Sequence, residues 1–377
     1  MILSICVVLL SVFIIFFFTK YKFCSYKRLI LSYSETYVIN SIFKYALPVI
    51  LLSVLFGFRY EIGTDYLNYK EIYETSFSGS LKQSLTESNV EYIYAFISHI
   101  LYHAGLPYYI MFFVMALIPM CFFYAAFKDK PFLIGYAAYF LAATGVLFWF
   151  FNIQRQGIAF FILLFSIKYI KNKNFNKFLL CVIIATGFHV SSLLFIFCYL
   201  FSFFKYSLIF KPVTLAVIYV FFGVFASSLK NILIKLVSIF LTGKYLYYVD
   251  SIESWEMGIG SGLGILSMHI VDLILIFSSG FLCKYFKEYR YDIYFRTFYV
   301  GSLFANIAGT NMVLSRFPFC FTSIRFVLLS FLTYYMITKW KTINIYRKAG
   351  WCCILGLSVL MLLGNAYNNP YEFVPSL

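Results

Sequence analysis

Long apolar runs alternate with short polar segments along the whole chain. About 20 apolar residues are enough to cross a bilayer as a helix. This pattern predicts an all-α, polytopic integral membrane protein with about 12–13 transmembrane helices in a single transmembrane domain over residues 1–377. We expect membrane spans near 2–19, 41–58, 107–127, 131–151, 156–170, 178–203, 212–229, 231–249, 262–283, 294–314, 318–338 and 349–366. The shorter segment 92–104 is expected to be interfacial or re-entrant.

Composition agrees with this class. The chain is 62% apolar and 12% charged, against about 25% charged in soluble domains, which excludes an ordinary globular enzyme. A net charge of +15 would suggest a nucleic-acid partner in a soluble chain. Here Lys and Arg gather at the ends of apolar runs, as topology signals do, so no nucleic acid is expected. The nine Cys form no C-x-x-C and lie mostly in apolar runs, which favours neither disulfides nor a metal site.

The basic segments predict the orientation of the chain. Loops rich in Lys and Arg face the cytoplasm, and here they are 20–44, 128–130, 168–177, 230–235, 284–290 and 339–348. The outward segments are then 59–91, 152–155, 204–211, 250–261 and 315–317. The two longest, an outward loop at 59–91 and a second outward loop at 250–261, hold most of the acidic residues.

Four arginines stand near the outward ends of predicted spans: Arg59, Arg155, Arg316 and Arg325. Arg155 lies beside Gln156 in "FNIQRQGIAF". Charged groups at membrane depth are costly and mark functional sites, and guanidinium binds phosphate oxygens bidentately. We expect the arginines to form one outward site for a multiply charged anion such as a lipid-linked pyrophosphate. A single membrane Arg can instead snorkel to the interface.

The stretch "FRYEIGTDYLNYKEIYE" (58–74) is acidic and rich in tyrosine. If residues 65–74 are helical, Asp65, Tyr69 and Tyr73 share one face. Tyrosine rings beside carboxylates suit sugars, because the ring packs on C–H groups while the carboxylate accepts from hydroxyls. This predicts a sugar-binding face that includes Tyr66, Tyr69 and Tyr73. The alternative is an aromatic belt at the membrane interface.

Three side chains are candidates to accept a proton from an attacking hydroxyl: Asp65, Glu61 and His189. The alternative for Asp65 is a cap on the helix that follows it. His189 lies in "GFHVSSLLF", in the outward half of its predicted span. The alternative role for His189 is to form a hydrogen bond between two helices.

Four strings in this order, "FRYEIGTDYLNY", "NIQRQGIAFFI", "FHVSSLL" and "NMVLSRFPFCF", resemble the EpsG-like group of Wzy-type polysaccharide polymerases. The resemblance runs from about residue 56 to about residue 335. It implies a GT-C-like fold in the bacterial cytoplasmic (inner) membrane, with the active site facing outward. It also implies a glycosyltransferase that joins undecaprenyl-pyrophosphate-linked oligosaccharide repeat units into O-antigen, capsule or exopolysaccharide.

The resemblance also implies roles for particular residues and partners. Asp65 or His189 would serve the acceptor hydroxyl, and the pyrophosphate leaving group would bind Arg59, Arg155, Arg316 and Arg325. The partners would be the lipid-linked glycan donor and acceptor, membrane lipids and, as a further candidate, a chain-length-regulating membrane protein. The reaction needs no cofactor or metal. The rival functions are a lipid-linked oligosaccharide flippase or other transporter, and a membrane acyltransferase with His189 as base.

Overall fold

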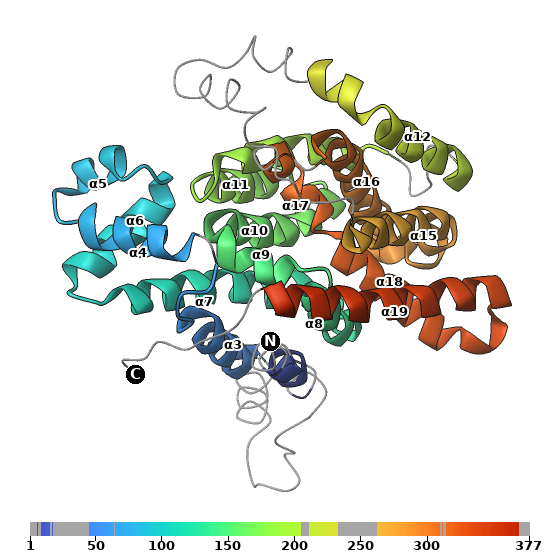
Figure 1. The fold of residues 1–377 in the computed structure, drawn as a ribbon, viewed down its shortest axis with the longest axis horizontal. Helices are drawn as coiled ribbons and strands as arrows, with labels where there is room; N and C mark the ends of the chain where they lie inside the picture. The colour runs from blue at the N-terminus through green and yellow to red at the C-terminus, as the bar shows by residue number, and fades with distance from the viewer. Residues whose placement is uncertain are drawn as a thin grey trace, which may run out of the picture. The chain divides into compact units, whose positions relative to one another are not determined.

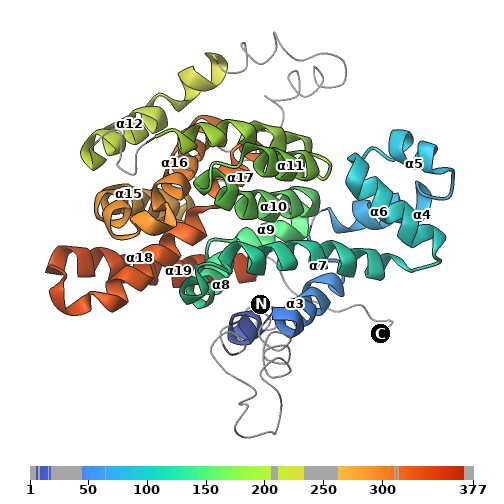
Figure 2. The same cartoon turned by 180° about the vertical axis from the view of Figure 1, so that it is seen from behind.

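The computed structural model describes residues 6, 9–15, 17, 45–63, 65–204, 211–232, 262–309, 311 and 314–368. Throughout these residues the chain forms α- and 3₁₀-helices and contains no β-strand (Figures 1 and 2), which confirms the all-α prediction. The chain divides into two compact units, which are described separately. The second outward loop predicted at 250–261 and the basic segment at 20–44 lie outside the described residues.

Unit 1 comprises Met1–Tyr169, Asn174–Leu193 and Ser358–Leu377. Helices α3 and α7 pack along each other, and a Cβ at Gly57 would lie 2.4 Å from the Phe113 Cα, so only glycine allows this approach. The elements of unit 1 are α3 (Leu47–Gly57), α4 (Tyr66–Thr75), α5 (Leu81–Glu87), α6 (Tyr92–His103), α7 (Tyr108–Phe127), η2 (Pro131–Leu133), α8 (Ile134–Ala143), α9 (Val146–Asn152), most of α10 (Gln154–Lys171), α11 (Phe175–Thr186) and the end of α19 (Ile345–Asn368).

Unit 2 comprises Ile170–Lys173 and Leu194–Leu357. Within it α15 contacts α12, α16 and α18, and α16 also contacts α12 and α17 (Figure 1). Its elements are most of η3 (Val190–Ser202), α12 (Pro212–Val224), α15 (Leu263–Tyr285), η4 (Lys287–Tyr289), α16 (Tyr291–Ala308), η5 (Leu314–Arg316), α17 (Phe319–Thr322), α18 (Arg325–Thr338), η6 (Trp340–Thr342) and the first part of α19.

The described helices have the length and composition of a multi-pass membrane protein. Four helical segments are long and apolar enough to cross a bilayer: Tyr108–Phe127, Gly264–Tyr285, Phe319–Thr338 and Ile345–Asn365. Two further spans arise if each of two bent helix pairs crosses the bilayer as a single span. These are Pro131–Ala143 with Val146–Asn152, bent by 57°, and Pro212–Val224 with Ala226–Ile232, bent by 74°. The full number of crossings stays a prediction.

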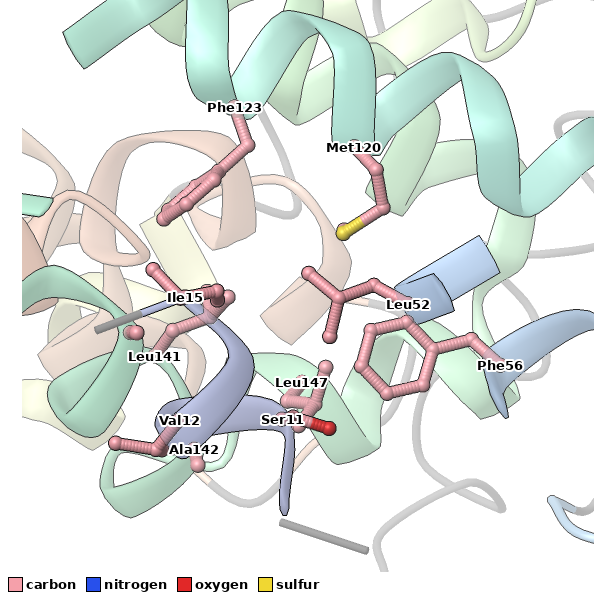
Figure 3. A pocket seen from close by; sticks show the side chains of 11 residues that line it. Ser11, Val12, Ile15, Leu52, Phe56, Met120, Phe123, Leu141, Ala142 and Leu147 are labelled. Carbon is pink, nitrogen blue, oxygen red and sulfur yellow. The ribbon is translucent and has the colours of Figure 1, made fainter. Parts of the chain in front are cut away.

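The interior of unit 1 is apolar where α3, α7, α8 and the N-terminal residues 11–15 meet. A small cavity there is lined almost entirely by carbon and sulfur atoms, with Leu52, Phe56, Met120 and Phe123 facing it (Figure 3). Ser11 supplies the one polar side chain of this lining. Such a cavity is a packing feature of the helix interface, because it offers no group that could orient a polar ligand.

Contacts within unit 2 conflict with the predicted orientation, because they bring the start of the predicted outward segment 204–211 beside the predicted cytoplasmic segment 284–290; residues 205–210 lie outside the described residues. Arg290 Nη2 donates to the Phe201 carbonyl at 3.2 Å, and the Arg296 guanidinium carbon lies 4.9 Å from the centre of the Phe204 ring. Lys171 Nζ lies 5.9 Å from the centre of the Tyr289 ring. The end of η3 is therefore beside the basic turn 284–290, at the end of the unit that the positive-inside rule assigns to the cytoplasm.

Helix α12 consequently runs in the direction opposite to the predicted one. Its first residue, Pro212, lies against Gly280 near the end of α15, where a Cβ would be 3.3 Å from Pro212 Cγ. Further along α12, the Tyr219 carbonyl accepts from Asn306 Nδ2 at 3.1 Å, near the end of α16. If the turn 284–290 is cytoplasmic, Lys230, which was also expected on that side, follows α12 towards the opposite end of the unit; Lys235 lies outside the described residues.

The apolar run 178–203, predicted as one span, is not one continuous helix. The chain breaks it at Gly187–His189 into the 12-residue α11 and the 13-residue η3. At 1.5 Å and about 2.0 Å per residue these rise about 18 Å and about 26 Å. Helix α11 belongs to unit 1 and most of η3 to unit 2, so the number of times this run crosses the membrane stays a prediction.

Together with a cytoplasmic turn 284–290, the contacts of unit 2 predict that a cysteine at Lys211 is cytoplasmic. A membrane-impermeant maleimide should label Lys211→Cys only after permeabilisation, while Ser78→Cys, in the 59–91 loop, should be labelled in intact cells. The parent chain, with its nine native cysteines, is treated in parallel to give the background. Labelling of Lys211→Cys in intact cells would restore the single crossing predicted for 178–203.

Candidate functional site

Glu91, Arg155 and His189 meet at one end of unit 1. Glu91 Oε1 accepts from His189 Nδ1 at 2.9 Å and from the Val190 amide at 3.3 Å. Glu91 Oε2 accepts from Arg155 Nη1 in a close ion pair. The side chains of Glu91, Arg155 and His189 are 18%, 24% and 19% exposed, so each is largely but not completely buried. One carboxylate thus holds the start of α10 and the break between α11 and η3.

A close helix approach brings Glu91 to His189. Glu91 is the residue immediately before α6, and two residues later the Ile93 amide donates to the Gly187 carbonyl at 2.9 Å. A Cβ at Gly187 would lie 2.5 Å from the Ile93 side chain. The glycine therefore lets the start of α6 contact the end of α11, which explains why a residue without a side chain stands two positions before His189.

Burial of the Glu91 carboxyl by itself would raise its pKa. The hydrogen bond from His189 and the charge of Arg155 outweigh this effect and place the pKa of Glu91 below its usual value. The group is therefore ionised near neutral pH and can only accept hydrogen bonds. His189 consequently donates from Nδ1, and its Nε2 bonds no group in the described part of the chain.

Aromatic and amide side chains surround this cluster. The Arg155 guanidinium carbon lies 5.8 Å from the centre of the Tyr69 ring, which is 5.8 Å from that of Tyr94. Tyr94 donates to the buried Gln154 at 3.4 Å. The side-chain nitrogen of Gln156, which is also buried, lies 3.5 Å from Ser191 Oγ. The polar start of α10 thus lies against the "HVSS" segment after α11.

The carboxylates predicted as proton acceptors lie elsewhere in the loop. Asp65 precedes α4 at its cap position, but its half-buried side chain makes no capping hydrogen bond. Glu61 is exposed and has a φ of 50°, in the left-handed region. Neither residue has a hydrogen bond or ion pair to His189 in the described structure. Asp65 thus forms neither a hydrogen bond with His189 nor the capping hydrogen bond that was its alternative role.

The tyrosines of α4 share a buried face, as their spacing predicts. Tyr66, Tyr69 and Tyr73 are at most 4% exposed. Tyr66 stacks on Phe112 with ring centres 4.9 Å apart, and Tyr73 donates to the Leu106 carbonyl at 2.8 Å. These rings pack against protein, so a sugar would reach them only after the loop had moved.

Arg59 and Arg316 lie in different surroundings. Arg59 is fully buried in unit 1, where Nη1 donates to the Phe56 carbonyl at 2.8 Å and the guanidinium carbon is 4.6 Å from the Phe112 ring centre. In unit 2, Arg316 is exposed at the end of η5. The convergence of all four arginines on one site stays a prediction.

Arg325 is held by an aspartate that the sequence analysis did not single out. Its Nε and Nη2 donate to the two oxygens of Asp272 at 2.6 and 3.0 Å. Asp272 also accepts from Tyr219 Oη at 3.2 Å, and Tyr219 Oη is 2.7 Å from His269 Nδ1. Because the carboxylate already binds a bidentate cation, Arg325 is engaged within unit 2.

Glu91 and Asp272 are thus the two residues that sequence reasoning missed. Asp272 gave a usable signal, since it is a carboxylate in the middle of an apolar run. Glu91 gave none, because it is one of several acids in an outward loop. Among the described residues no group of three or more His, Cys, Asp or Glu could hold a metal ion.

The family model for the EpsG family matches residues 42–375, and the chain belongs to this family. The match extends further towards the C-terminus than the motifs that carry the resemblance. It supports a role in polysaccharide biosynthesis at the membrane. No curated protein and no solved structure matches the chain.

The buried pair in unit 2 predicts a stability effect. Asp272→Asn leaves the Arg325 charge without its counter-charge, and breaking a buried pair in this way costs about 3–5 kcal/mol. We expect a clearly lower midpoint of thermal unfolding for the purified variant in detergent. The matched control is Asp129→Asn, at an exposed aspartate, which should unfold like the parent. Equal midpoints for Asp272→Asn and Asp129→Asn would show that the pair contributes little.

Proposed function

We propose that this member of the EpsG family is a membrane glycosyltransferase that polymerises lipid-linked oligosaccharide repeat units. The donor would be an undecaprenyl-pyrophosphate-linked glycan, and the acceptor a terminal sugar hydroxyl of another lipid-linked unit. The reaction would take place on the outer face of the bacterial cytoplasmic membrane. The single observation that supports this most is the cluster of Glu91, Arg155 and His189, which combines a proton acceptor with a cation.

The proposed chemistry follows from this cluster. The acceptor oxygen attacks the anomeric carbon of the donor, the glycosidic bond forms, and the bond to the lipid pyrophosphate breaks. His189 Nε2 takes the proton of the acceptor hydroxyl, and the ionised Glu91 holds the ring in the required tautomer and stabilises the imidazolium that results. Arg155 uses one N–H group on Glu91 and has further donors for the phosphate oxygens.

The remaining candidate residues receive different roles in this proposal. Arg155 is the candidate ligand of the pyrophosphate in unit 1, and the exposed Arg316 of unit 2 remains a separate candidate. Arg59 and Arg325 act in the framework, because the first is buried among aromatic rings and the second binds Asp272. Asp65, Glu61 and Gln156 remain candidates for hydrogen bonds to the sugars. The proposed reaction uses no cofactor.

A flippase for the same lipid-linked units is the rival function. A deletion strain separates the two, through its lipid-linked intermediates and its surface polysaccharide. We expect single repeat units to persist at the surface while long chains disappear, because units would still be exported but not joined. Loss of all surface repeats would favour the flippase.

Substitutions in the cluster test the mechanism. His189→Ala should lower polymer formation by roughly 10²–10⁴-fold, the usual contribution of general base catalysis, with normal protein abundance in the membrane. Glu91→Gln should also shorten the chains, because the neutral amide no longer stabilises the imidazolium. Polymer is measured by gel electrophoresis of surface polysaccharide. The control is Glu87→Gln, at an exposed acid in the same loop, which should give parental chains.

Asp65→Asn distinguishes between the two candidate bases. Asparagine keeps the shape of aspartate but loses its charge and proton affinity. With His189 as base, the variant should retain long chains within a few-fold of the parent amount, measured on the same gels. If Asp65→Asn loses long chains and His189→Ala retains them, Asp65 is the base and the role of His189 is structural.

A further inference from the structure

The last turns of α6 carry two histidines on one helix face. His99 and His103 are four residues apart, and their ring centres lie 4.0 Å apart with an angle of 38° between the planes. His99 is half-buried and His103 is exposed. Histidines at positions i and i+4 of a helix are placed to bind one metal ion together, as in the metal-binding helices of many enzymes.

The Nδ1 atoms of both rings are occupied by hydrogen bonds. His103 Nδ1 donates to the His99 carbonyl at 3.1 Å, and His99 Nδ1 is 2.8 Å from Ser84 Oγ in α5. These bonds fix the ring orientations and leave both Nε2 atoms for another partner. Metal-binding histidines have this arrangement, since they give their second nitrogen to a carbonyl or other polar group that holds the ring.

We propose that His99 and His103 form a two-histidine chelate for a borderline divalent metal ion, with Zn²⁺ as the probe. Imidazole nitrogen suits Zn²⁺, Cu²⁺ and Ni²⁺ and suits Mg²⁺ and Ca²⁺ poorly. The described residues add no further His, Cys, Asp or Glu to make a group of three, so water completes the coordination and the ion exchanges readily. The site is separate from the glycosyl transfer proposed above.

Such a chelate would act on the helix that begins next to Glu91. Both ligands lie in α6, and Ser84 ties one of them to α5, so the bound ion would hold α6 in its helical form and against α5. The metal would therefore stabilise the outward region that contains these two helices, without taking part in proton transfer at His189.

Calorimetric titration of the purified full-length protein with Zn²⁺ tests the proposal. The protein is produced with a tag that lacks histidine, in detergent, near neutral pH. We expect one ion per chain for the parent and loss of this binding in His99→Ala and His103→Ala. Ser84→Ala should weaken binding by about tenfold, the lower end of the usual effect of losing a group that orients a ligand.

Two variants serve as matched controls. The double substitution His103→Ala with Ala104→His keeps the number of histidines but changes their spacing from four to five residues, and should bind as weakly as His103→Ala. His189→Ala should bind like the parent, which separates this site from the proposed catalytic one. Thermal unfolding without metal confirms that every variant is folded. Absence of binding in the parent, or equal binding in the spacing variant, would overturn the proposal.

Discussion

A charge in the apolar part of a membrane protein needs a counter-charge beside it, because lipid and packed side chains cannot replace its water shell. Glu91 in unit 1 and Asp272 in unit 2 are examples, and the buried Asp292 pairs with Arg290 in the same way. Glu91 neutralises Arg155 and receives a hydrogen bond from His189, while Asp272 holds Arg325 through two hydrogen bonds. Each carboxylate therefore offsets the cost of burying its cation.

The pairing in unit 1 has consequences for both architecture and chemistry. Glu91 connects the start of α6 with α10 and with the segment after α11, so the contact that holds these helices together also selects the tautomer of His189. Gly187 makes this connection possible, because any side chain there would collide with Ile93. A change that loosened the helices would therefore also disturb the proposed proton acceptor.

Breaks within apolar segments decide the path of the chain. The run after Asn174 ends its α-helix at Thr186 and continues as a 3₁₀-helix from Val190, with His189 between them. A break of this kind exposes backbone groups that must find partners at membrane depth. Here the Val190 amide donates to Glu91 and the His189 amide donates to the Ala185 carbonyl, so the break is stabilised by the same carboxylate that binds the histidine.

The tyrosines of α4 show what spacing does and does not predict. Residues four apart on a helix share a face, so the common face of Tyr69 and Tyr73 follows from their positions alone. Which surface that face contacts depends on other segments. Here α6 supplies Tyr94, α7 supplies Phe112, and the turn between them supplies the Leu106 carbonyl. Arg59 is similar, since its place at the end of an apolar run gave no sign of the rings around it.

The sequence by itself determined that this is an all-α membrane protein of the EpsG family, and it marked Arg155 and His189 as unusual polar residues. These are local properties, because hydropathy, charge and motif are written in consecutive residues. Only the tertiary structure decided that His189 has Glu91 as partner, 98 residues earlier in the chain, and that the end of η3 lies beside the turn 284–290. Such pairings depend on which distant segments pack together. Several arrangements would bury equally apolar segments, and the free energy of burying a charge selects among them.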